Sequence, residues 1–357
     1  MKNLAFSYVV IALATWLPIA KAVSPPDHAA LNRAPKSTAT DSKPALTLSL
    51  TTGAVMPGSF LALKDSALAF LAYSDNGENL HVIRDGVDTV TRLELSSLAT
   101  VLLGLTESYI VSGDGGYFTV RDRSTGRFLR HKMFRDFAPP HWVANDVWLD
   151  GDKLTFVSEG STDNDAILRR ISIPTLEVSD RRPAPFAGFF TRWGDAIVGV
   201  GYSRVEPFRF PPSVAVFDEE FRMKSIAPND GCRSLCGAMK DGLAAIGNSL
   251  FYDAGDGEVR LYNLGAMKPA GTFEPLGPSK LASLHLIGNR LLIREKNGDD
   301  SGGSAILLDV PDTHPVYEHQ FTGKHVVISG TRVYEFMGDG TQPSPSTDIE
   351  IYSLPAD

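Results

Sequence analysis

Apolar and polar positions alternate along the chain in a unit that recurs many times. One half of this unit is an apolar strand, a tight polar turn and a second apolar strand. Its seven copies are residues 60–74, 101–113, 147–160, 190–203, 243–255, 284–298 and 325–338. Four of the turns contain Gly-Asp or Gly-Asn pairs, which tolerate the positive φ of a tight hairpin turn. The pattern therefore predicts a β-hairpin in each copy.

The other half of the unit is a strand, a turn and a more polar strand. It recurs at residues 79–95, 117–133, 166–180, 213–226, 258–273 and 305–321. A seventh copy, residues 348–357, stops before its final strand, whereas residues 45–50 form an apolar strand with no partner ahead of the first unit. Because pairing these two segments would close the series and hide an exposed edge, we expect the first strand to complete the last unit.

The repeat has the length of a propeller blade. Its turn anchors are 41 to 53 residues apart, at Lys64, Thr106, Gly151, Gly194, Gly247, Gly288 and Gly330, and blades typically span about 40–50 residues. Over residues 45–357 the chain resembles the seven-bladed β-propeller superfamily, in particular its WD-repeat-like and quinoprotein-like members. The resemblance is architectural, because the Gly-His and Trp-Asp pairs of WD repeats are absent. It implies an all-β fold of seven four-stranded antiparallel blades, closed by the N-terminal strand; a six- or eight-bladed ring and a pair of β-sandwiches are the alternatives.

The N-terminus has the features of a secretory signal peptide. Lys2 precedes an apolar run from residue 4 to 19, and Ala20-Lys21-Ala22 supplies a small-x-small cleavage pattern. A retained membrane anchor is the alternative, but Pro18 and the short run disfavour a spanning helix. We expect cleavage after Ala22, a flexible Pro- and Ser-rich linker over 23–44 and a propeller over 45–357, in a periplasmic or secreted protein without a membrane span after processing.

Charge and cysteine content restrict the partners. A formal net charge of −8 disfavours nucleic acid and anionic membranes as partners. The two cysteines, Cys232 and Cys236, are separated by three residues. In an exported protein this spacing favours a local disulfide over a redox-active pair, which normally has two intervening residues.

Two enlarged connections in the fourth and fifth units break the regularity of the repeat. Residues 204–212 alternate basic and aromatic side chains, and residues 228–240 hold Arg233 between the two cysteines. Since binding residues concentrate on loops of a rigid scaffold, we hypothesise a recognition site here; harmless insertions are the alternative. The candidate binding residues are Arg204, Phe208, Arg209, Phe210 and Arg233, with His141 and Trp142 on the same face.

Acidic residues gather in the loops between the second and third strands of the units. They include Asp75, Glu78, Asp114, Asp163, Asp165, Asp253, Asp256 and Glu258. They are interpreted as turn formers, as an acidic docking face for a basic partner, or as calcium ligands. The best calcium candidates, Asp253, Asp256 and Glu258, do not follow the EF-hand spacing. No other cofactor is predicted.

Motifs of catalysis are absent from the sequence, which lacks a Gly-x-Ser-x-Gly elbow, a His-Glu-x-x-His helix and a phosphate-binding glycine loop. The predicted inner strands are mostly apolar, and Trp148 and Trp193 are expected in the core. We therefore favour a non-catalytic module that binds an envelope or secreted protein. The alternatives are a propeller enzyme or enzyme subunit, of quinone-linked dehydrogenase, lactonase or cyclase type, and a small-molecule or glycan receptor that stacks ligands on Trp142, Phe208 and Phe210.

Overall fold

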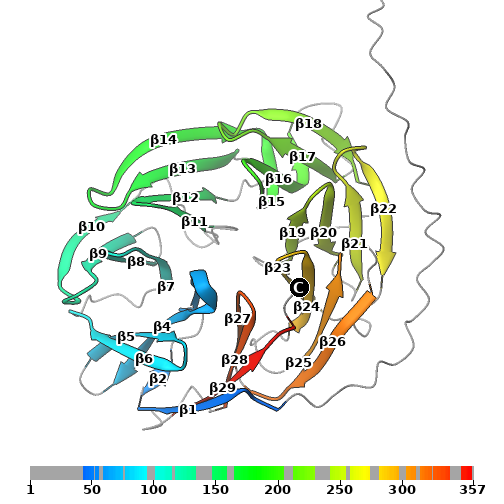
Figure 1. Cartoon of the computed structure of the whole chain (residues 1–357). Helices are drawn as coiled ribbons and strands as arrows, with labels where there is room; N and C mark the ends of the chain where they lie inside the picture. The colour runs from blue at the N-terminus through cyan, green and yellow to red at the C-terminus, as the bar shows by residue number, and fades with distance from the viewer. Residues whose placement is uncertain are drawn as a thin grey trace, which may run out of the picture.

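The computed structural model places seven β-sheets in a ring around a central axis (Figure 1). It describes residues 43–51, 53–55, 59–74, 77–94, 101–114, 117–133, 147–158, 165–204, 212–229, 242–254, 258–273, 281–296, 303–310, 314–323, 325–337 and 347–355. The expected all-β fold of seven blades is confirmed. Among the described residues, no helix is long and apolar enough to cross a membrane.

The first four blades follow one another along the chain. Blade 1 holds β2 (Ala54–Val55), β3 (Leu61–Ala62), η1 (Lys64–Ser66), β4 (Leu68–Ser74), β5 (Gly77–Arg84) and β6 (Val87–Arg92). Blade 2 holds β7 (Val101–Leu105), β8 (Tyr109–Asp114), β9 (Tyr117–Asp122) and β10 (Phe128–Met133). Blade 3 holds β11 (Val147–Asp150), β12 (Lys153–Ser158), β13 (Ala166–Ser172) and β14 (Glu177–Ala184). Blade 4 holds β15 (Phe186–Trp193), β16 (Ala196–Ser203), β17 (Ser213–Phe217) and β18 (Met223–Pro228).

The last three blades complete the ring. Blade 5 holds β19 (Leu243–Ile246), β20 (Ser249–Asp253), β21 (Val259–Asn263) and β22 (Lys268–Phe273). Blade 6 holds β23 (Leu281–Ile287), β24 (Arg290–Lys296), β25 (Gly303–Asp309) and β26 (His314–Phe321). Blade 7 holds β27 (His325–Ser329), β28 (Arg332–Phe336), β29 (Thr347–Ser353) and, from the N-terminal side, β1 (Leu46–Leu50).

The two ends of the propeller chain meet in blade 7. β1 pairs antiparallel with β29, in a register that sets Leu46 opposite Ile351 and Leu50 opposite Thr347. The expected closure by the first strand is therefore confirmed. It joins segments about 300 residues apart and gives the outer edge of β29 a backbone partner.

The inner hairpins use the turn residues that the sequence offers. Gly151, Gly194 and Gly247 have φ of 56°, 58° and 55°, a region that glycine adopts without steric cost. Blade 1 differs from the expected tight hairpin, because the 3₁₀ turn η1 connects β3 to β4 there, with Asp65 at φ 60°. The inner strand of this blade is also divided, since β2 and β3 both pair with β4.

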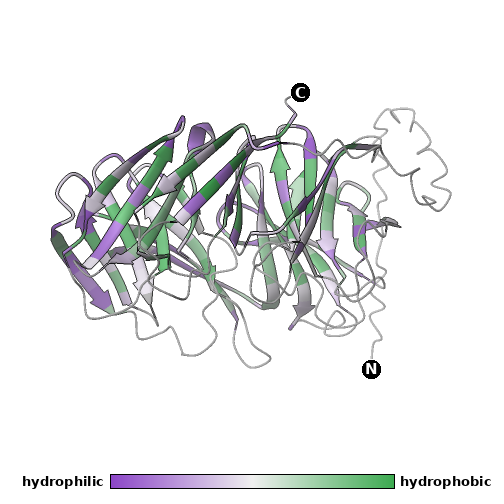
Figure 2. Ribbon diagram, turned by 90° about the horizontal axis from the view of Figure 1, so that it is seen from below, coloured by the Kyte–Doolittle hydropathy of each residue, from purple (hydrophilic) through white to green (hydrophobic). Residues whose placement is uncertain are grey.

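The core lies between neighbouring blades rather than at one centre. Each blade carries apolar side chains on both faces of its middle strands, and Figure 2 shows apolar residues along most of them. Between blades 3 and 4 the core is aromatic, with Phe186, Phe190, Phe217 and Phe221 in mutual contact. Such ring pairs add to the stabilisation from apolar burial.

Candidate functional site

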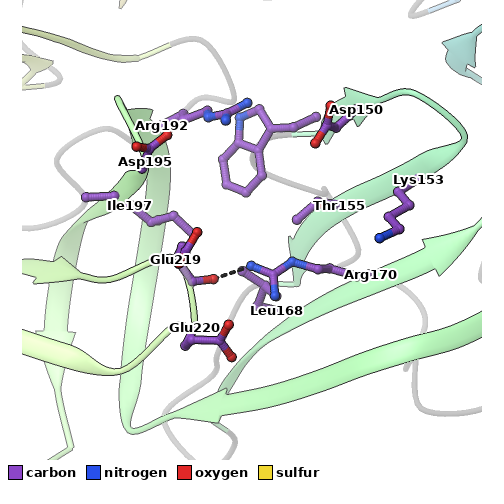
Figure 3. Close-up of a pocket in the computed structure, with 12 residues that line it drawn as sticks. Asp150, Lys153, Thr155, Leu168, Arg170, Arg192, Asp195, Ile197, Glu219 and Glu220 are labelled. Atoms are coloured by element: carbon purple, nitrogen blue, oxygen red, sulfur yellow. Dashed lines mark hydrogen bonds between the residues drawn. The ribbon is translucent and has the colours of Figure 1, made fainter.

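A cavity opens between blades 3 and 4, which we call the blade 3–4 groove. Its volume is about 320 Å³. Its lining residues are Trp148, Asp150, Lys153, Thr155, Leu168, Arg170, Arg192, Asp195, Ala196, Ile197, Glu219 and Glu220. Figure 3 shows Asp150, Lys153 and Arg170 on one side, with Asp195, Glu219 and Glu220 across the cavity.

Strand alternation explains why blade 3 contributes these side chains. Trp148 and Asp150 lie two residues apart on β11, and Leu168 and Arg170 lie two apart on β13. Residues two apart in a strand share one face. Leu168 and Trp148 also contact the aromatic core between blades 3 and 4, so this face of blade 3 is the one turned toward blade 4.

Arg170 connects the two blades at the groove. Its Nη1 lies 2.9 Å from Asp180 Oδ2 on β14, and its Nη2 donates a hydrogen bond to the backbone carbonyl of Glu219 in blade 4 (Figure 3). Arg182 Nη2 lies 3.1 Å from Glu220 Oε2 across the same seam. We infer that Arg170 is mainly a structural brace, because both of its terminal nitrogens already bond to protein groups.

The remaining charges of the groove carry both signs. Lys153, Asp150 and Asp195 have no side-chain partner among the described residues, and Arg192 uses only Nε, in a 3.0 Å bond to the Gly194 carbonyl. A neutral ligand with several hydroxyl groups would find donors and acceptors here together with an indole surface at Trp148. A strongly anionic ligand would be repelled by Asp195, Glu219 and Glu220, and a strongly cationic ligand by Lys153 and Arg170.

The turn beside the groove is held by Asp218. Its carboxylate accepts hydrogen bonds from the Arg222 backbone amide (2.9 Å), from Arg222 Nε (2.9 Å) and from Lys224 Nζ (3.0 Å). Burial acts to raise the pKa of Asp218, but the bonds from the Arg222 amide and from Lys224 and Arg222 outweigh it and hold the pKa well below its ordinary value. The turn that carries Glu219 and Glu220 is therefore fixed by an ionised aspartate at neutral pH.

A second unusual region is an exposed apolar surface on the outer strands of blades 1 and 2, which we call the outer-rim patch. Its residues and their exposed fractions are Val87 64%, Val90 53%, Phe128 44%, Leu129 48% and Met133 47%. All six residues of β10 are exposed. Figure 1 shows β6, β10 and β14 following one another round the rim.

Specific contacts tie these rim strands end to end. The backbone amide of Glu94, just after β6, donates to the Gly126 carbonyl at 2.9 Å. The end of β10 is tied to blade 3, because Lys132 Nζ donates to the Leu176 carbonyl at 2.7 Å. The patch therefore lies on strands that are fixed relative to each other.

A buried ion pair lies at the seam beneath this patch. Arg121 of β9 and Glu78 of β5 are fully buried, with Arg121 Nη2 3.5 Å from Glu78 Oε2. Arg121 also donates to Ser112 Oγ (2.9 Å) and to the Glu94 carbonyl (3.2 Å). Burial lowers the pKa of Arg121, and the Glu78 carboxylate opposes this shift. Glu78 was expected in an exposed acidic loop; that prediction is wrong, because the next blade buries it against Arg121.

The predicted recognition loops fall almost wholly outside the described residues. Phe208, Arg209, Phe210, Arg233, His141, Trp142, Cys232 and Cys236 all lie there, as does the predicted signal peptide. Arg204 is described and ends the fourth-blade hairpin, where its Nη1 lies 2.6 Å from Asp165 Oδ1 of the preceding blade. The recognition site and the disulfide stay predictions.

The calcium candidates are placed only in part. Asp253 is buried at the end of β20, and Glu258 Oε2 lies 2.7 Å from Arg260 Nη2. Asp256 lies outside the described residues. No group of three or more metal-ligating side chains occurs in the part of the chain that the structure describes, and calcium binding remains a prediction.

Sequence reasoning did not anticipate either the groove or the patch. Trp148 was expected in the core, and it does contact the core, but it also lines the groove. The signal for the patch is visible in hindsight, because β10 reads FLRHKM without proline or glycine. An outer strand of that composition lacks the proline that protects a sheet edge, although it does carry Arg130 and Lys132.

Comparisons with known proteins support the fold and go no further. No protein-family model matches the chain, and no curated protein matches its sequence. A structure of the mitotic checkpoint complex matches with a TM-score of 0.58 and 11% identity, over 99% of this chain and 100% of that one. The chain is a seven-bladed β-propeller.

Two further solved structures are similar over a smaller share of the chain. The computationally designed Ika8 protein matches with a TM-score of 0.51 and 15% identity, over 84% of this chain and 83% of that one. BamB from Moraxella catarrhalis matches with a TM-score of 0.49 and 13% identity, over 84% and 85%. At these identities the likeness concerns the path of the backbone, so any function must be argued from the surface of this propeller.

Proposed function

We propose that this chain is an exported, non-catalytic propeller that binds another protein of the cell envelope or a secreted protein. The observation that carries the proposal is the outer-rim patch, where five large apolar side chains are exposed on neighbouring strands. Scattered apolar residues are normal on a protein surface, but in β10 three of six consecutive exposed residues are large and apolar, and such a concentration favours an interaction site.

The surroundings of the patch also favour a protein partner. The patch lies on a convex rim of fixed strands rather than in a cavity, and a small molecule is bound best in a concave site that encloses it. Protein interfaces instead combine an apolar centre with a polar border. Arg92, Arg127 and Arg130 would supply that border, since all three are exposed.

Site-specific photo-crosslinking tests this proposal. A photoreactive residue would replace Val90 or Leu129 in the exported protein, expressed in its native host. We expect one partner to be crosslinked at both positions and identified by mass spectrometry. Thr272 on β22 is the matched control, because it is also exposed on an outer strand. Equal adducts at all three positions, or none at Val90 and Leu129, would overturn the proposal.

A second candidate function is the binding of a small neutral polar ligand, such as a sugar, in the blade 3–4 groove. It is favoured by Trp148 beside uncommitted groups of both charge signs. Calorimetric titration with a panel of mono- and disaccharides would test it, with Trp148→Ala as the variant that should lose binding. Trp193→Ala is the matched control, since Trp193 packs against the core on the other side of blade 4. Absence of heat with every sugar would reject this candidate.

A further inference from the structure

The outermost strand of blade 2 is an open sheet edge. β10 is the terminal strand of the order β10-β9-β8-β7, and it has no described partner beyond β9. An edge strand presents backbone N–H and C=O groups to which another strand can add. We propose that β10 accepts an added strand from its partner, and that the added strand is an extended, acidic segment. This inference rests on the proposed function and specifies its binding mode.

Strands β14, β22 and β26 carry residues that disfavour such an addition, whereas β6 reads VDTVTR and, like β10, has neither proline nor glycine. β14 contains Arg181, Arg182 and Pro183, β22 contains Lys268 and Pro269, and β26 contains Pro315. Lysine, arginine and proline at sheet edges disfavour pairing with another chain. β10 has basic residues as well, but it has no proline or glycine and exposes Phe128, Leu129 and Met133.

β10 is already held in the conformation that strand addition needs. The Phe128 amide donates to Glu94 Oε2 at 2.8 Å, and Lys132 Nζ donates to the Leu176 carbonyl at the other end. The His131 ring stacks on Tyr117 of β9, with centroids 5.1 Å apart and planes inclined by 21°. Binding of a partner strand would therefore cost little conformational entropy in β10, because this strand is already ordered.

The register of β10 limits where the added strand can pair. A bulge lies between Phe128 and Arg130, whereas Arg130–Met133 follow β9 in regular register. The outer strands of blades 3 to 6 have bulges between corresponding strand pairs, so the bulge does not distinguish β10. The regular stretch is about 13 Å long at 3.3 Å per residue, which suits a short extended segment.

Charge determines what kind of strand fits. Residues 123–133, which form β10 and the turn before it, carry Arg123, Arg127, Arg130 and Lys132 and no carboxylate. Of the nearby carboxylates, Asp85 pairs with Arg332 (3.1 Å), Asp88 contacts His81 (2.8 Å) and Asp122 accepts from the Ser124 hydroxyl (2.7 Å). Glu94, between the two strands, accepts from the Phe128 amide.

The cations of the same region are free to act on a partner. Arg92, Arg127 and Arg130 are exposed, and their guanidinium groups have no partner among the described residues. Residues 123–133 therefore present four arginine and lysine side chains and no carboxylate, on a chain of net charge −8. An acidic strand would be attracted here, whereas a second copy of β10 would place like charges opposite one another.

Hydrogen–deuterium exchange of the mature protein tests the inference. The probe is a blocked seven-residue peptide of alternating valine and glutamate, added at millimolar concentration. We expect exchange in the segment 128–133 to slow at least about tenfold, as for amides that gain strand partners. Two control peptides separate the contributions: one N-methylated at alternate residues, which cannot complete the backbone ladder, and one with lysine in place of glutamate. Neither should protect β10.

Charge reversal provides the matched variants. Arg130→Glu should weaken the valine–glutamate peptide about tenfold, whereas Thr272→Glu on β22 should leave its affinity unchanged. No protection at β10, or equal protection by the N-methylated or lysine peptide, would overturn strand addition. If peptide binding gives that result but a partner is still crosslinked at Val90 and Leu129, the proposed function stands and the partner binds through side chains. If no partner is crosslinked at these positions either, the proposed function is also overturned.

Discussion

The outer rim of this propeller differs between blades 1 and 2 and blades 4 to 6. At the described positions of β18, β22 and β26 the exposed residues are Lys224, Pro228, Lys268, Pro269, Gly271, Thr272, Glu318 and Gln320. On β6 and β10 they include five large apolar side chains. The seven outer strands have the same place in the fold, so architecture does not explain the difference. Where a rim strand exposes several large apolar side chains, the exposure supports the proposed binding of a partner.

The largest effect is expected from the ion pair beneath the patch. Arg121→Ala leaves the Glu78 carboxylate buried without its cation, which should lower the free energy of unfolding by about 3–5 kcal/mol. Chemical denaturation would measure this loss. Arg182→Ala is the control, because Arg182 lies half exposed on the rim of blade 3 and its removal should cost at most about 1 kcal/mol. Similar losses for the two variants would contradict the role of the buried pair.

Replacing the exposed apolar residues of β10 by acidic ones should abolish the difference between the two rims. The double variant Phe128→Glu/Met133→Glu should reduce partner binding at least about tenfold, because it places two charges in the apolar centre of the interface and repels an acidic partner strand. Its free energy of unfolding should change by less than about 1 kcal/mol, since both side chains are exposed. Crosslinking yield at Val90 and denaturation measure the two quantities. Unchanged crosslinking would show that the patch is not the interface.

A substitution in the opposite half of the ring should affect stability without affecting binding. The Trp193 Nε1 donates to the Gly247 carbonyl at 2.5 Å and so joins blades 4 and 5. Trp193→Phe keeps an aromatic ring but removes this bond, at a cost of about 1 kcal/mol. Thermal unfolding would detect the loss, and crosslinking at Val90 should not change. A reduced crosslinking yield would mean that the two halves of the ring are coupled.

The smallest effect concerns the pH dependence of the blade 4 turn. Because the pKa of Asp218 is lower in the folded protein than in the unfolded chain, its ionisation stabilises the fold above about pH 4, and this contribution is lost progressively as the pH falls below that value. Asp218→Asn should therefore lower the Tm at pH 7, and the difference from the wild type should shrink below pH 4. A constant difference across this range would contradict the assignment. Crosslinking at the rim should be unaffected by the substitution at pH 7.

Much of the fold could be predicted from sequence because its signals are local. Hairpin turns such as Gly194-Asp195 and Gly247-Asn248, together with period-two strands, define each blade without reference to any other. The closure could also be predicted. The last unit lacks one strand, and residues 45–50 are the one strand that belongs to no unit, so these two were expected to pair. Blade 1 is the exception, because Asp65 and Ser66 adopt positive φ in a 3₁₀ turn that the pattern does not signal.

Only the tertiary structure decided what the surfaces of these blades do. Both faces of a blade are covered by its neighbours, so alternation along β5 does not reveal that Glu78 meets Arg121 of blade 2. For the same reason Trp148 could be recognised as a residue of the core but not as part of a groove, which depends on the distance between blades 3 and 4. The sequence by itself determined the blades, their number and their closure, since each depends on contacts within a unit or on a count of strands. Packing between blades determined which charges are buried, where a cavity remains and which rim is exposed, because these depend on residues far apart in the chain.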